Sequence, residues 1–139
     1  MTKPYPTDFD IVWCAKDKKD AVAVFLTAGQ GPFPEEIADT DWVALESNLL
    51  SLPITTEARL IVTVPRPEGY AEFAIRGLYV YDWRDAHRSH AEESSLYECV
   101  AVPTIPIGSS AVREKLPYLE NVSFEDSLNL PPDIFGPSK

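Results

Sequence analysis

Both histidines of the chain lie in one polar stretch, close to three carboxylates. The residues are Asp85, His87, His90, Glu92 and Glu93. Histidine titrates near neutral pH and is a common metal ligand, so the stretch is a candidate for metal binding or acid–base catalysis. However, the zinc-protease helix motif has its histidines four residues apart with a glutamate after the first, and this spacing differs. Arg88 also stands beside His87 and opposes cation binding. We interpret the stretch as a surface loop. An alternative function for the chain is a small metal-dependent enzyme that uses His87 and His90.

A glycine-containing turn and two cysteines are the other candidates for chemistry. Gly29 and Gly31 could offer backbone N–H groups to a phosphate. However, Pro32 and Pro34 have no N–H to donate, and no Gly-Lys-Ser/Thr follows. Cys14 and Cys99 lack a recognisable histidine or basic partner that would lower a thiol pKa. We therefore predict no catalytic, metal-binding or cofactor-binding residue, and we expect both cysteines to be structural thiols.

The elements that would position these residues are short strands and two helices. Runs of β-branched and aromatic residues predict strands at 10–15, 21–27, 58–64, 78–83 and 96–102, of which the first two form a hairpin. Apolar residues at three- and four-residue spacing predict helices within 39–53 and 67–77. A short third helix within 109–116 and a last strand within 120–127 complete the expected set.

This pattern predicts an α+β fold in one domain. We expect an antiparallel or mixed sheet of about five to six strands with two main helices. The domain is expected to span residues 1–127, because the Pro-rich segment 128–139 has the composition of a loosely held C-terminal tail.

Three aromatic residues alternate along the expected strand at 78–83. Tyr79, Tyr81 and Trp83 therefore share one face of that strand. Either a helix covers this face, or the face is an exposed binding surface, since Tyr and Trp dominate interface hot spots. A domain that oligomerises through Tyr79 and Tyr81 is thus a further alternative function.

The chain is strongly acidic, with 22 Asp and Glu residues against 12 Lys and Arg residues and a formal net charge of −10. Two stretches contain no basic residue, one between Lys19 and Arg59 and one between Lys115 and Lys139. Such a field repels nucleic acid and anionic membranes and attracts a basic partner. No apolar run approaches a membrane span of about 18 residues, and the N-terminal segment lacks the features of a signal peptide. We expect a cytoplasmic protein.

Three segments of the chain resemble a group of small bacterial proteins. They are DIVWCAKDKKDAVAVFLTAGQGPFP, GLYVYDWRDAHR and YECVAVPTIP. The group shares a D-x-x-W-x-x-x-D start, a V-x-x-F-x-x-x-G-x-G-P turn and an R-G-(Leu/Phe)-Y-V-Y-D-W segment, and the similarity covers residues 9–106. It is identified with the immunity-like proteins of polymorphic toxin and interbacterial competition systems. The resemblance implies a non-enzymatic protein that neutralises a cognate toxin by direct binding, and it brings no catalytic residue.

The resemblance agrees with the charge, because an acidic surface is steered towards a basic toxin. We therefore predict that this chain binds a cognate toxin or effector protein. The predicted partner contacts are Asp82, Trp83 and Asp85, and the acidic residues Glu35, Glu36, Asp39, Asp41 and Glu46.

Overall fold

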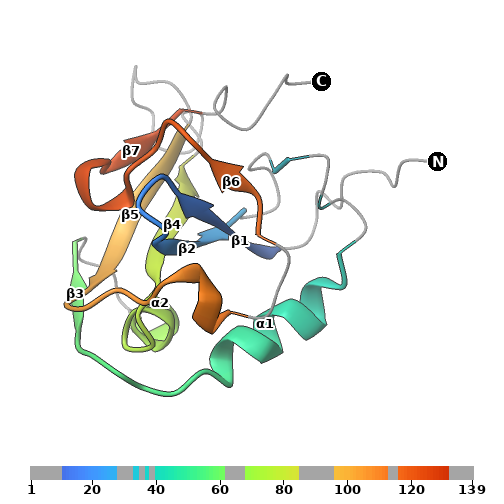
Figure 1. Cartoon of the computed structure of the whole chain (residues 1–139), viewed down its shortest axis with the longest axis vertical. Coiled ribbons are helices and arrows are strands. Elements are labelled where there is room, and N and C mark those ends of the chain that lie inside the picture. Colours follow the sequence, from blue (N-terminus) through green and yellow to red (C-terminus); the bar gives the residue numbers. More distant parts are fainter. Residues whose placement is uncertain are drawn as a thin grey trace.

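The computed structural model describes residues 11–27, 33–34, 37, 40–61, 68–84, 96–112 and 116–131 (Figure 1). Within these ranges, seven strands form one mixed sheet, and two α-helices pack against it. The strands are β1 (Val12–Asp17), β2 (Val22–Leu26), β3 (Ala58–Leu60), β4 (Tyr79–Arg84), β5 (Leu96–Pro103), β6 (Tyr118–Leu119) and β7 (Asn129–Leu130); the helices are α1 (Trp42–Leu50) and α2 (Glu68–Ala74). The α+β fold is confirmed. The strand number exceeds the expected one because β6 and β7 are too short to show a sequence period.

The sheet has the order β3-β5-β4-β2-β1-β6. Neighbouring strands are antiparallel except for the β2–β4 and β1–β6 pairs, which are parallel. A parallel pair requires a crossover, and the chain between β2 and β4 supplies it with α1, β3 and α2. On the side of β5 away from β4, β3 pairs with residues 101–103 and β7 pairs with residues 97–98.

The expected hairpin is formed by β1 and β2. Its turn places Asp20 in the left-handed region with φ 67°, which a short polar side chain tolerates. Asp17, at the end of β1, accepts hydrogen bonds through Oδ1 from the backbone N–H groups of Lys19 and Ala21, each at 2.9 Å. The polar turn is therefore held by the first carboxylate within it.

Both expected helices are present, and local signals explain where they end. Asp41 is the N-cap of α1, and its Oδ1 accepts a hydrogen bond from the N–H of Ala44 at 3.1 Å. Leu45 and Leu49 are the buried residues of α1, which packs against β1. After α2, Gly77 takes φ +92°, the left-handed conformation that follows many helices.

The aromatic face of the sheet consists of Trp13, Phe25, Tyr79, Tyr81, Trp83 and Tyr97, all of them buried. Cross-strand register brings Trp13 opposite Phe25, and Phe25 opposite Tyr81. The ring centroid of Phe25 lies 4.3 Å from that of Trp13 and 5.3 Å from that of Tyr81, in stacked geometry. The shared face expected for Tyr79, Tyr81 and Trp83 is thus present.

Residues 118–130, which we call the C-terminal strap, cover this face. The strap begins with β6 on the β1 edge and ends with β7 on β5, so it spans the sheet from side to side (Figure 1). A 3-10 turn at Phe124–Asp126 places the Phe124 ring 5.7 Å from that of Tyr81 and 6.1 Å from that of Phe25. The expectations of a helix over the aromatic face and of a strand at 120–127 were therefore wrong.

The start of the expected tail is part of the sheet. The carbonyl oxygen of Leu128 accepts a hydrogen bond from the N–H of Cys99 at 2.8 Å, and Leu130 is buried within β7. The ordered domain thus continues past residue 127, and residues 132–139 lie outside the described ranges. The expected third helix is a single 3-10 turn at Ser109–Ala111.

Candidate functional site

Two of the predicted contact residues lie on α1 and are exposed. Asp41 precedes the first turn and Glu46 lies in its middle. Leu45 and Leu49 face the core, and Glu46 lies ~100° further round the helix from Leu45, where its side chain is exposed. Both residues are therefore accessible to a partner, and their role as contacts stays a prediction.

The same side of α1 carries an exposed apolar residue. Val43 is 80% exposed, the largest exposed fraction among the large hydrophobic side chains that the structure describes. Ala44 and Ser47 are also exposed, and Ile54, just beyond the helix, is 63% exposed. We call Asp41, Val43, Ala44, Glu46 and Ser47 the α1 outer face. It combines apolar contact area with two carboxylates, and it belongs to the stretch between Lys19 and Arg59 that contains no basic residue.

The helical period of α1 separates Val43 from Leu45 and Leu49, the buried residues of the helix. The helical stripe of Trp42, Leu45, Leu49 and Leu52 faces inwards, and Val43 falls outside it. A β-branched apolar residue on the solvent side of a helix has no packing role within the domain. Its position therefore indicates a candidate contact surface.

Asp82 and Trp83 do not lie on an open surface together. Adjacent residues of a strand point to opposite faces, so Trp83 belongs to the aromatic face and Asp82 to the helix-covered face. Trp83 is 8% exposed and its ring packs edge-on against Tyr97, with centroids 5.0 Å apart. Asp82 is half-buried and accepts a hydrogen bond from the hydroxyl of Tyr70 at 2.7 Å. The predicted exposed contact at Trp83 is therefore wrong, since the side chain is part of the core.

The other predicted residues fall outside the described ranges. These are Glu35, Glu36, Asp39 and Asp85, and the histidines of the alternative metal site, His87 and His90. Among the described residues, no group of three or more His, Cys, Asp or Glu side chains is arranged to hold a metal ion.

Oligomerisation through Tyr79 and Tyr81 requires an accessible aromatic face. The strap closes that face, and Tyr81 is fully buried. Its hydroxyl donates to the carbonyl oxygens of Phe124 and Ser127, which ties the strap to the sheet. The aromatic residues therefore stabilise the fold and do not form an interface.

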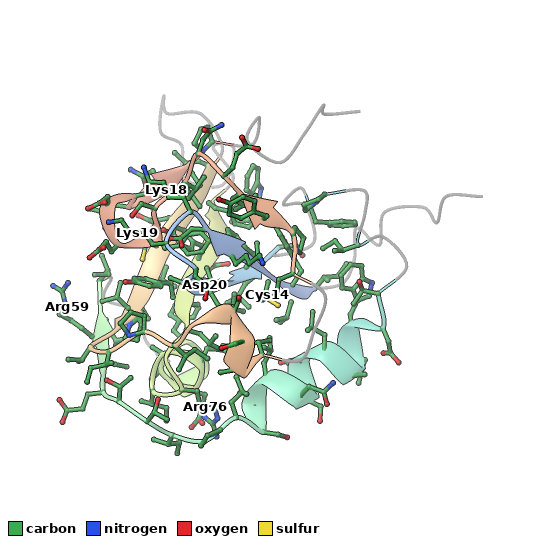
Figure 2. The ribbon with its side chains drawn as sticks, viewed as in Figure 1. Cys14, Lys18, Lys19, Asp20, Arg59 and Arg76 are labelled. Carbon is green, nitrogen blue, oxygen red and sulfur yellow. The ribbon has the colours of Figure 1, made fainter. Side chains whose placement is uncertain are left out.

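A hollow of about 430 Å³ opens beside the hairpin turn, and no sequence pattern indicates it. Its charged lining consists of Asp17, Lys19, Arg59 and Glu125, two acids and two bases. Figure 2 shows Lys19 on the hairpin and Arg59 on β3, on the same side of the molecule. Because the opposite charges balance, the lining favours neither a cation nor an anion.

Hydrogen bonds already occupy most of the charged groups around the hollow. Lys19 Nζ lies 2.7 Å from Glu125 Oε1 and 3.2 Å from Asp126 Oδ2, and these bonds raise the pKa of Lys19. Hydrogen bonds from Ser123 and then from Lys19 lower the pKa of Asp126. Burial, followed by the charge of Glu125, raises the pKa of Tyr79. None of these shifts brings a group towards neutral pH, where acid–base catalysis operates.

No known protein family, curated protein or solved structure matches this chain. Within the described residues, no helix is both long and apolar enough to span a membrane. The α1 outer face is therefore the candidate functional site on its own physical features, which are charge and exposed apolar area.

Proposed function

We propose that this chain is a non-enzymatic cytoplasmic binding protein, and that it acts as an immunity protein against a cognate bacterial toxin. The α1 outer face is the contact surface in this proposal. The observation that carries it is the exposure of Val43 and Glu46, three residues apart on a helix that Leu45 and Leu49 anchor in the core, with Asp41 exposed at the start of the same helix. The resemblance to immunity-like proteins supports the same function.

Charge and apolar contact would contribute separately to binding. The net charge of −10 raises the rate of encounter with a basic partner, because opposite charges steer diffusion. Affinity then requires apolar contact beside polar groups, which exposed Val43 offers next to Glu46. A helix held by Leu45 and Leu49 presents this surface without an ordering cost on binding.

The proposal is tested by co-expressing the chain with each protein encoded beside its gene. One neighbour should arrest growth alone, be neutralised by this chain and co-purify with it. The affinity of that complex is then measured for Val43→Asp and for Asp41→Asn with Glu46→Gln. We expect each variant to weaken binding at least about tenfold, a loss of about 1.4 kcal/mol.

A matched control removes two exposed acids elsewhere, by Glu120→Gln with Glu125→Gln on the C-terminal strap. The control has the same net charge as the α1 double variant but keeps both acids of the α1 outer face. We therefore expect its association rate to fall only slightly. The function is contradicted if no neighbouring protein is toxic or none forms a complex. The assignment of the surface is contradicted if the α1 variants bind as tightly as the control.

A further inference from the structure

Strand β3 forms one edge of the sheet. Among the described strands, it pairs only with β5, with Arg59 opposite Val102. Beyond the ends of β3, the N–H of Thr104 donates to the carbonyl of Glu57, and the N–H of Ile61 donates to the carbonyl of Val100, each at 2.9 Å. In an antiparallel ladder, alternate residues bond to the same neighbour. Residues 57, 59 and 61 therefore face β5, and the backbone groups of Ala58 and Leu60 face outwards.

The side chains at this edge are accessible. Glu57 and Arg59 are exposed, and Leu60 is 39% exposed. Because side chains alternate along a strand, Glu57 and Arg59 share one face and Leu60 lies on the other. Neither Glu57 nor Arg59 has an ion-pair partner among the described residues. The edge thus carries the opposite charges of Glu57 and Arg59 two residues apart. The backbone N–H and carbonyl groups of Ala58, between them, face outwards.

We propose that β3 pairs with the β3 strand of a second copy of this chain, in antiparallel orientation, and that the two sheets join across a two-fold axis at Ala58. In this register, Ala58 lies opposite Ala58 of the second copy. Glu57 then lies opposite Arg59 of the second copy, and the symmetry repeats this pair. Opposite charges placed directly across a strand pair stabilise it.

The charges also select this register from its neighbours. A two-fold axis at Arg59 would place two guanidinium groups directly opposite one another, which is destabilising. An axis at Leu60 would place Arg59 opposite Ile61 and leave Glu57 without a partner. Only the axis at Ala58 satisfies both charges at once, which makes the edge complementary to itself.

The net charge of each copy opposes association but does not prevent it. At physiological salt, charges more than about 8 Å apart are largely screened, whereas charges in direct cross-strand contact are not. The α1 outer face lies away from β3, with α1 and β3 at opposite sides of the view in Figure 1. The dimer would therefore leave both α1 outer faces open to a partner.

Sedimentation of the full chain over a range of concentrations tests the proposal. The wild-type mass should rise from 15.5 kDa towards twice that value at high concentration. Glu57→Arg and Arg59→Glu should each remain monomeric over the same range, because each places like charges opposite one another. The double variant with both changes restores the opposite pairs and should dimerise again.

A wild-type chain that stays monomeric at every concentration would overturn the proposal. So would single variants that dimerise like the wild type, or a double variant that does not recover. Circular dichroism establishes that each variant is folded. As a second measurement that needs no variant, hydrogen exchange at the Leu60 amide should slow with increasing wild-type concentration, and unchanged exchange would contradict the pairing.

Discussion

The buried carboxylate of Asp17 accepts a hydrogen bond from the backbone N–H of Phe124 at 2.7 Å, although 107 residues separate them. Its other oxygen accepts the N–H groups of Lys19 and Ala21 within the hairpin turn. One side chain therefore closes the turn and positions the 3-10 turn that places Phe124 over the aromatic face. The C-terminal strap depends on an acid that the first hairpin supplies.

Asp17→Asn should lower the free energy of unfolding by about 2 kcal/mol, because hydrogen bonds to a charged acceptor are worth about 1.5–3 kcal/mol. An asparagine can keep one oxygen on the turn, but its NH₂ group would then face the N–H of Phe124. Urea denaturation measures the change. Glu120→Gln is the matched control, since it removes the same charge from an exposed position of the strap. Equal stabilities of the two variants would contradict the role of Asp17.

Tyr81→Phe removes the hydroxyl that donates to the carbonyl oxygens of Phe124 and Ser127. The loss should destabilise the fold by about 1–2 kcal/mol, because the Ser127 carbonyl loses the hydroxyl as its donor, whereas the Phe124 carbonyl keeps the N–H of Ser127. Tyr118 provides the control, since its side chain is 56% exposed and Tyr118→Phe should be nearly neutral. Thermal unfolding of the two variants compares them directly, and the result is contrary to expectation if Tyr81→Phe melts with the wild type.

Gly77→Ala should destabilise the chain by more than about 1 kcal/mol. Gly77 has φ +92°, and an added Cβ would lie 2.5 Å from Ile107 Cγ2 and 2.9 Å from the backbone nitrogen of Ile107. Gly69→Ala, within α2, meets no atom within 4 Å and should be neutral or stabilising, because alanine favours a helix. Chemical denaturation should show a loss of stability for Gly77→Ala only, and two similar losses would refute this reading of Gly77.

Stability should fall at alkaline pH through Cys99. Burial raises the pKa of the Cys99 thiol from 9.0 to about 11. Between these values the folded chain keeps a proton that the unfolded chain has released, so the free energy of unfolding decreases as the pH rises from about 9 to 11. Below about pH 9 this contribution is complete and constant.

Urea denaturation of wild type and Cys99→Ala across pH 7.5–10.5 isolates the effect of this thiol. The substitution leaves a cavity and lowers stability at every pH, so the informative quantity is the slope. The wild type should lose more stability than Cys99→Ala above about pH 9. Parallel curves would show that the thiol ionises equally in both states.

Local sequence signals predicted most of the helices and strands, but they did not predict the C-terminal strap that covers the aromatic face. The hairpin, α1 and α2 follow from periodicity, the Asp41 cap and Gly77, all of which act within a few residues. The strap could not be predicted in this way. Its strands have two residues each, and the Asp17–Phe124 bond joins distant parts of the chain.

At the candidate site too, local patterns predicted which side of an element a residue occupies but not which distant segment covers it. Helical spacing was enough to leave Glu46 outside the buried stripe of Leu45 and Leu49. A period of two placed Trp83 correctly on a face, but the period does not reveal what covers that face. The burial of Trp83 depends on Tyr97 and on a strap that local patterns do not indicate.

The most direct test of the α1 outer face is the association rate with the cognate toxin, measured by stopped-flow mixing across a series of salt concentrations. We expect a rate that falls steeply with increasing salt. For Asp41→Asn with Glu46→Gln, the rate should be lower and less dependent on salt, while asparagine preserves the N-cap and hence the stability. A rate that is independent of salt, or that is unchanged by the double substitution, would contradict the claim that this acidic helix face recruits a basic partner.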